Sequence, residues 1–154
     1  FAAAREKNEA AFVTFVTAGY PSAKDTPSIL LAMQEGGASV IELGVPYTDP
    51  QADGATIQKT NQIAIAGGTS DLIACFAMVA EARKMGLTVP VVLMGYYNIF
   101  YQFGIEELMD SSAAAGVDGF IIVDLPPDEA MEFTEAAGKR GLSNVPLVAP
   151  TSTN

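Results

Sequence analysis

Residues 40–54 read V-I-E-L-G-V-P-Y-T-D-P-Q-A-D-G, and they begin like a buried, β-branched strand. Glu42 interrupts that strand, and two more carboxylates, Asp49 and Asp53, follow in a loop rich in Pro and Gly. Glu is almost never fully buried unless it is paired. Two interpretations of Glu42 therefore stay open. Either it has a structural role, paired with a cation such as Lys59 or exposed at a strand end, or it is a functional carboxylate at the carboxyl end of a parallel strand, where ligands of such folds bind.

The sequence around these carboxylates bears on their chemistry. The chain has no His, so acid–base chemistry near neutral pH falls to carboxylates, Lys, Tyr or the single cysteine, Cys75. Apolar neighbours are expected to raise the pKa of Glu42 toward neutrality, which suits a group that both gives and takes a proton. Asp49-Pro and Asp53-Gly are turn dipeptides, and the residues alone favour turn roles for both. Asp124 is a similar strand-end or helix-entry residue.

Five short apolar runs have the composition of strands covered on both faces. They are Phe12–Thr17, Ser39–Leu43, Val91–Met94, Gly119–Val123 and Pro146–Ala149.

Helical segments are predicted between these runs. Thr26 and Pro27 have the character of an N-cap and a first helical residue. Residues 70–85 place Cys75 on an apolar stripe, which makes it a core residue, and Pro127 is expected to open a later helix. Strand and helix in alternation predict a parallel sheet in one domain, residues 1–154. The pattern fits both a complete flavodoxin-like sheet and the first five-eighths of a (β/α)8 barrel.

Composition excludes several classes of protein. The net charge of -10 argues against a nucleic-acid partner. A single cysteine, the lack of a ~20-residue apolar run and the lack of a secretory signal favour a cytoplasmic protein. Without His or a Cys pair, no metal site is predicted. No dinucleotide-binding, P-loop or nucleophile-elbow motif is present.

Residues 42–54 closely resemble the signature E-L-G-x-P-[FY]-[ST]-D-P-x-A-D-G of the tryptophan synthase alpha subunit family. The resemblance extends to F-V-T-A-G-Y-P at 15–21, L-M-G-Y-Y-N at 93–98 and G-V-D-G-F-I-I-V-D-L-P at 116–126. It implies a (β/α)8 barrel of which this chain covers about the first five strands. The chain is expected to begin partway through the N-terminal helix of that fold. Gln51 and Ala55 depart from the family pattern. These departures affect the expected loop packing and partner contacts, and not the carboxylates.

The resemblance also implies an activity. The family is a lyase that splits indole-3-glycerol phosphate into indole and glyceraldehyde 3-phosphate by a retro-aldol reaction without metal or cofactor. Glu42 would be the acid–base group, and Asp53 would accept the indole N–H hydrogen bond. The substrate phosphate is held in the family by later loops, beyond residue 154, so the isolated chain is expected to be inactive.

The remaining site residues are carried over in the same way. Those matching the indole pocket are Phe15, Tyr96, Ile121 and Val123. Those matching the surface toward the PLP-dependent beta subunit, or a fused beta domain, are Asp49, Asn98 and Pro126. The PLP belongs to that partner. Two alternatives stay open: a non-catalytic scaffold that binds and regulates a beta-type partner, and another phosphosugar-binding barrel enzyme, although such sites usually rely on Lys or His.

Overall fold

The computed structural model describes residues 1–150 of the chain, without the side chain of Ala3. Its five strands are β1 (Val13–Thr17), β2 (Val40–Gly44), β3 (Val91–Gly95), β4 (Gly119–Ile122) and β5 (Ser143–Pro146). Its helices are α1 (Ala2–Glu6), α2 (Thr26–Glu35), α3 (Ala55–Ala66), α4 (Leu72–Lys84), α5 (Tyr97–Phe103), α6 (Ile105–Ala115) and α7 (Met131–Lys139). The predicted domain extends to residue 154, four residues outside the described part.

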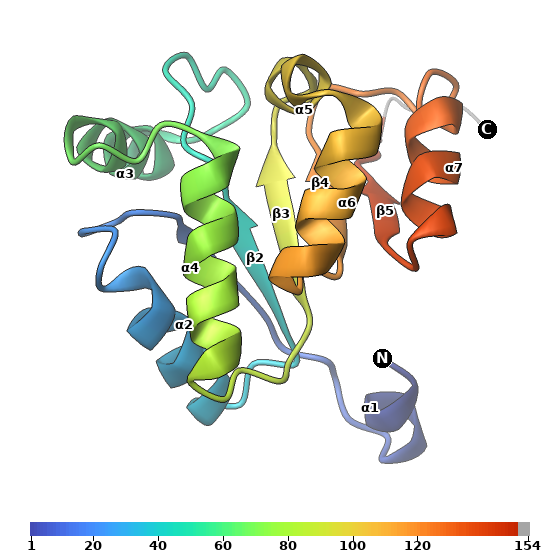
Figure 1. Cartoon of the computed structure of the whole chain (residues 1–154). Helices are drawn as coiled ribbons and strands as arrows, with labels where there is room; N and C mark the ends of the chain where they lie inside the picture. Colours follow the sequence, from blue (N-terminus) through green and yellow to red (C-terminus); the bar gives the residue numbers. More distant parts are fainter. Residues whose placement is uncertain (151–154) are drawn as a thin grey trace.

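Strand order decides between the two predicted architectures. The sheet is parallel throughout and runs β1-β2-β3-β4-β5. A flavodoxin-like sheet has the order 2-1-3-4-5 and helices on both faces, whereas barrel strands follow one another in chain order. Here helix α2 packs on α4, α4 on α6 and α6 on α7, and this row lies along one face of the sheet (Figure 1). The described fold is therefore an arc of a (β/α)8 barrel, and the flavodoxin-like alternative is wrong.

The first four predicted strands are confirmed to within one residue at either end. The fifth was predicted at 146–149, but the structure has it at Ser143–Pro146. Its first residues, Ser143 and Asn144, lack strand-like character. The Asn144 side chain instead contacts α7, where its Nδ2 donates to Thr134 Oγ1 at 3.0 Å.

Two predicted helix starts need correction. Helix α2 has Asp25, and not Thr26, at its N-cap. The Thr26 hydroxyl instead accepts the Gly19 N–H at 3.0 Å, which fixes the loop after β1. Helix α7 begins at Met131 and not at Pro127, because the Pro127 carbonyl accepts the Ala130 N–H in a turn before the helix.

Helix α4 confirms the predicted stripe: Leu72, Cys75, Phe76 and Val79 are all buried. Burial raises the pKa of the Cys75 thiol to about 12, so the group stays a neutral core side chain.

Three phenylalanines seat the region after β3. Phe100 of α5, Phe120 of β4 and Phe133 of α7 are at most 1% exposed. The Phe120 ring lies edge-on to Phe100 at 5.6 Å and to Phe133 at 5.2 Å between ring centroids. Such edge-to-face pairs add to the free energy of apolar burial. They anchor α5, which begins directly after Tyr96.

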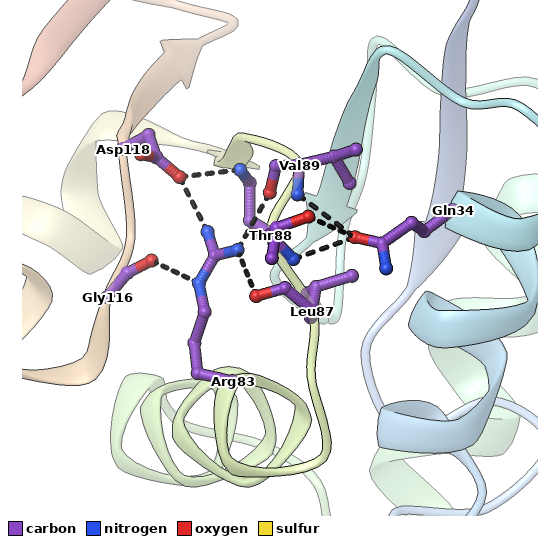
Figure 2. Close-up of polar contacts among 8 residues, drawn as sticks. Gln34, Arg83, Leu87, Thr88, Val89, Gly116 and Asp118 are labelled. Atoms are coloured by element: carbon purple, nitrogen blue, oxygen red, sulfur yellow. Dashed lines mark hydrogen bonds and ion pairs between the residues drawn. The ribbon is translucent and has the colours of Figure 1, made fainter.

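A guanidinium ties together the amino end of the sheet (Figure 2). Arg83 of α4 donates to the carbonyls of Gly116, Leu87 and Val89 at 2.8–3.0 Å. Its Nη2 pairs with Asp118 Oδ2 at 2.7 Å. These partners precede β3 and β4, so one side chain fixes the entry of the chain into two strands. We call this network the Arg83 clamp.

Two further contacts extend the clamp. Asp118 Oδ2 also accepts the N–H of Val91, the first residue of β3, at 2.8 Å. Gln34 at the end of α2 accepts the N–H groups of Thr88 and Val89 at 2.7 and 3.1 Å (Figure 2). The polar backbone before β3 is thereby satisfied by side chains of α2 and α4.

Candidate functional site at the carboxyl end of the sheet

Strand β2 directs Glu42 away from the helices. Ile41 and Leu43 alternate with it and are fully buried on the helix-covered face. Glu42 therefore faces the inside of the barrel arc, level with Phe15 of β1 and Val92 of β3. Its carboxylate is half-buried, and burial raises its pKa. The rise in the pKa of Glu42 matches the prediction from its apolar neighbours in sequence.

The proposed Glu42–Lys59 pair does not form. Among residues 1–150, the ion pairs are those of Arg83, Lys84 and Arg140 with nearby carboxylates. Glu42 thus keeps its partial burial without a cation to offset it, which is the reason its pKa rises.

Gly44 makes room for an aromatic ring on the inner face. A Cβ at Gly44 would lie 2.6 Å from Phe15 Cζ, closer than any such contact allows. The Phe15 ring therefore lies across Gly44, which is the next residue after Glu42 on the same face of β2. No role for Gly44 could be predicted from the sequence, because the contact joins residues of different strands.

Asp53 lies at the end of the loop that follows β2. Its N–H donates to the Pro50 carbonyl at 3.2 Å, and its carbonyl accepts from Gln58 Nε2 at 2.9 Å. Helix α3 begins two residues later, at Ala55, where the sequence analysis predicted only a turn. The Asp53 side chain is half-buried, and burial raises its pKa as well.

Tyr96 connects the end of β3 to that loop. Its hydroxyl oxygen accepts the N–H of Ala52 at 2.7 Å, and its ring stacks on Tyr47 with centroids 4.7 Å apart. Burial raises the pKa of the Tyr96 phenol, and the carboxylates of Asp53, Asp124 and Asp49 add to the rise against the opposing Ala52 hydrogen bond. The phenol is therefore neutral at physiological pH.

Four of the predicted site residues meet in one narrow cleft. Its lining residues are Phe15, Gly44, Val45, Asp53, Ile57, Asn61, Met94, Gly95, Tyr96 and Val123. Just outside it is a wider cavity of about 440 Å³ that shares Tyr96 and Val123. Ile121 is buried beside the cleft, opposite Met94 in the register of β3 and β4. Met94, Ile57 and Asn61 were missed, since only the fold brings their segments together.

The three residues predicted to face a partner are all exposed at this end of the sheet. Asp49 accepts a bond from Gln51 Nε2 at 3.4 Å. Asn98 of α5 donates to the Tyr47 hydroxyl at 3.1 Å, and Pro126 begins the turn before α7. Asp124 accepts the N–H of Tyr97, the first residue of α5, at 2.7 Å, so it caps a helix of an earlier segment and does not open α7, whose N-cap is Ala130.

Comparison with known proteins identifies the family of this chain. The family model for the tryptophan synthase alpha chain matches residues 1–154. This chain belongs to the tryptophan synthase alpha chain family. It is 50% identical to the tryptophan synthase of Saccharomyces cerevisiae over all of its length, and 45% identical to the alpha chain of Geotalea uraniireducens over 99%.

Solved structures agree with the family. The alpha subunit of Legionella pneumophila superposes with a TM-score of 0.94 at 34% identity, covering 99% of this chain and 58% of that one. The tryptophan synthase complex of Pyrococcus furiosus gives 0.86 at 41% identity, covering 93% of this chain and 58% of that one. The chain spans 56% of the Geotalea protein and 22% of the yeast protein. Within residues 1–150, no helix is long and apolar enough to cross a membrane.

Proposed function

We propose that this chain supplies the acid–base part of a lyase that cleaves indole-3-glycerol phosphate to indole and glyceraldehyde 3-phosphate. The observation that carries the proposal is the partial burial of two carboxylates, Glu42 and Asp53, without a cationic partner within residues 1–150. Glu42 and Asp53 lie at the carboxyl end of β2 and in the loop after it, both partly buried and both with a raised pKa.

The reaction needs one proton to arrive and one to leave. A proton added to C3 of the indole weakens the bond from C3 to the glycerol carbon. That bond then breaks, its electron pair returns to the ring, and the hydroxyl on the glycerol carbon loses its proton as the aldehyde forms. We assign both transfers to Glu42, because a carboxyl with a raised pKa keeps its proton to a higher pH than an ordinary Glu and can both give and take one.

Asp53 is assigned the indole N–H. The ring becomes positively charged when C3 is protonated, and a carboxylate that accepts the N–H hydrogen bond stabilises that charge. The cleft beside Asp53 is lined by Phe15, Met94 and Val123, an apolar lining with one polar edge of the kind an indole ring requires, and at about 20 Å³ it must widen to admit the ring. Protein groups alone supply these steps, and no cofactor is needed in this domain.

A partner belongs to the same proposal. We assign the exposed residues Asp49, Asn98 and Pro126 to a surface that faces a PLP-dependent beta subunit or beta domain, which takes up indole. The Pyrococcus relative is described as a tryptophan synthase complex, and the yeast relative is more than four times as long as this chain, which supports a partner or fused domain. We place the enzyme in the cytoplasm, since its lone cysteine is buried and forms no disulfide within the chain.

The test is formation of indole from indole-3-glycerol phosphate by the full-length gene product. Asp53→Asn keeps the shape of the side chain and removes its charge. We expect a loss of about 10²-fold in kcat, the magnitude typical of one preorganised electrostatic contact. If the wild-type protein binds a beta-type partner but forms no indole, the scaffold alternative replaces this proposal.

A further inference from the structure

The loop that carries Asp53 has few contacts of its own. Within residues 48–53, Thr48, Asp49, Gln51 and Ala52 are exposed, and only Pro50 is buried. A segment with so little apolar burial has low local stability. Its geometry depends on the few hydrogen bonds that hold its backbone.

Three of those bonds surround Asp53. The Pro50 carbonyl and the Gln58 side chain bind the backbone of Asp53 itself, at 3.2 and 2.9 Å. The third is the 2.7 Å bond from the Ala52 N–H to the Tyr96 hydroxyl, which reaches across 44 positions in sequence. The first two lie within residues 50–58, so among these only the Tyr96 bond ties the loop to the sheet.

Tyr96 is well placed to act as a fixed point. It comes directly after β3 and before α5, whose Phe100 is fully buried. Its ring is also held by the stack on Tyr47, whose hydroxyl in turn accepts from Asn98. Its raised pKa keeps the phenol neutral, so the oxygen remains a hydroxyl acceptor throughout the physiological pH range.

The Asp53 carboxylate itself has no side-chain hydrogen bond or ion pair within residues 1–150. Its direction is therefore set by the backbone at residues 52 and 53. We propose that the Tyr96 hydroxyl is a positioning group that holds the Ala52–Asp53 backbone and so aims the Asp53 carboxylate into the cleft. This role is separate from the contact of the Tyr96 ring with a ligand, and it rests on the proposed function of Asp53.

The test compares binding of indole with binding of 1-methylindole, which lacks the N–H. In the wild-type full-length gene product we expect about tenfold tighter binding of indole, the effect of one charge-assisted hydrogen bond. Asp53→Ala should abolish that preference. Tyr96→Phe keeps the ring and removes the hydroxyl, and should reduce the preference to about threefold or less.

Tyr101→Phe is the matched control. It makes the same chemical change, loss of a phenol hydroxyl, at a nearby tyrosine that is 63% exposed. The preference for indole over 1-methylindole should stay at its wild-type value. A Tyr96→Phe protein with the full wild-type preference overturns the positioning role while Asp53 keeps its own. A preference that survives in Asp53→Ala overturns the assignment of Asp53, and the positioning role with it.

Hydrogen exchange at the Ala52 amide tests the contact without any ligand. Although Ala52 is exposed, its N–H should be protected in the wild-type protein and should exchange at least tenfold faster in Tyr96→Phe. Exchange in the wild-type protein at the rate of an unprotected amide overturns the proposal, and this measurement remains decisive if Tyr96→Phe fails to fold.

Discussion

Arg83 at the amino end of the sheet has an acceptor for three of its nitrogens, whereas Glu42 and Asp53 at the carboxyl end lie partly buried without a cation. The clamp around Arg83 joins a carboxylate, Asp118, to three backbone carbonyls (Figure 2). At the other end, burial raises the pKa of both carboxylates, and no ion pair within residues 1–150 opposes it. One sheet thus holds a compensated charge network at one end and uncompensated carboxylates at the other.

The contrast separates charges that hold the fold from charges that are available for chemistry. A polar group whose hydrogen bonds are all made stabilises one arrangement of the fold. Removing one partner leaves the remaining groups without a hydrogen bond, which costs unfolding free energy. A partly buried carboxylate without a partner costs free energy in the folded protein, and such groups concentrate at functional sites. The two ends should therefore respond to mutation in opposite ways.

The largest effect is expected from exchanging one carboxylate at each end for its amide. Glu42→Gln removes the proposed proton carrier and should lower kcat by about 10³-fold, within the range of general acid–base groups. Its free energy of unfolding should stay within about 0.5 kcal/mol of wild type, because no partner is lost. Indole release and urea unfolding measure the two quantities.

The opposite pattern is expected at the amino end. Asp118→Asn leaves the Arg83 guanidinium without its counter-charge and, because the Asp118 side chain is 47% exposed, should cost about 1 kcal/mol of unfolding free energy. Its kcat should stay within about twofold of wild type. Loss of stability in Glu42→Gln together with loss of kcat in Asp118→Asn would reverse the comparison.

Removal of the clamp cation gives the next largest effect. Arg83→Met keeps most of the apolar stem but leaves the Gly116, Leu87 and Val89 carbonyls and Asp118 without their donor. We expect a loss of about 2–4 kcal/mol of unfolding free energy, measured by urea denaturation.

The neighbouring residue on α4 provides the control for this loss. Lys84→Met breaks an exposed pair with Glu81 at 3.4 Å and should cost about 0.5 kcal/mol or less. Equal losses for Arg83→Met and Lys84→Met would show that the clamp contributes no more than a surface ion pair.

A smaller effect is expected where the inner face is tightest. Gly44→Ala places a methyl group 2.6 Å from Phe15 Cζ and must displace the ring from the cleft. Overpacking of this kind costs about 1–3 kcal/mol of unfolding free energy. The displaced ring no longer packs against the ligand, so indole should also bind about tenfold more weakly, a loss of about 1.4 kcal/mol in binding free energy. Calorimetric titration with indole measures the change.

The control for this substitution is a glycine with open space around it. Gly138→Ala in α7 meets no atom within 4 Å and should leave indole affinity unchanged while slightly stabilising the helix. Unchanged indole affinity in Gly44→Ala would show that Phe15 does not line the binding cleft.

The smallest effect is the pH dependence of stability. A carboxyl whose folded-state pKa is raised stabilises the fold fully only below its ordinary pKa, and loses that contribution as pH rises through the folded value. Glu42→Gln cannot ionise at this position. Its unfolding free energy relative to wild type should therefore increase as pH rises above 4.5, the ordinary value for Glu. A difference that is constant between pH 4 and pH 7 would contradict this.

Most of this fold could be predicted because four of the five strands have a recognisable local pattern. The first four strands are apolar runs, and Leu72 to Val79 form a clear helical stripe. Strand β5 was misplaced because Ser143 and Asn144 are polar, and the contact of Asn144 with Thr134 forms only in the folded chain. Helix α3 was missed because it begins directly after a turn-like D-G pair and buries Asn61 in place of an apolar residue.

The candidate site was only partly predictable for the same reason. Glu42 stood out because a carboxylate in an apolar strand is a local anomaly, and its direction and raised pKa agree with that analysis. The bond from Ala52 to Tyr96 and the seat of the Phe15 ring on Gly44 join residues far apart in sequence. No local pattern carries such contacts, so the support around Asp53 is visible only in the structure.

The contrast between the two ends is tested most directly by titrating the Glu42 carboxyl by carbon-13 NMR in the full-length gene product. The resonance is assigned by its disappearance in Glu42→Gln. Uncompensated burial predicts a midpoint clearly above 4.5, the ordinary value for Glu. A midpoint at or below 4.5 would mean that Glu42 is solvated or paired, and would contradict its role as the proton carrier.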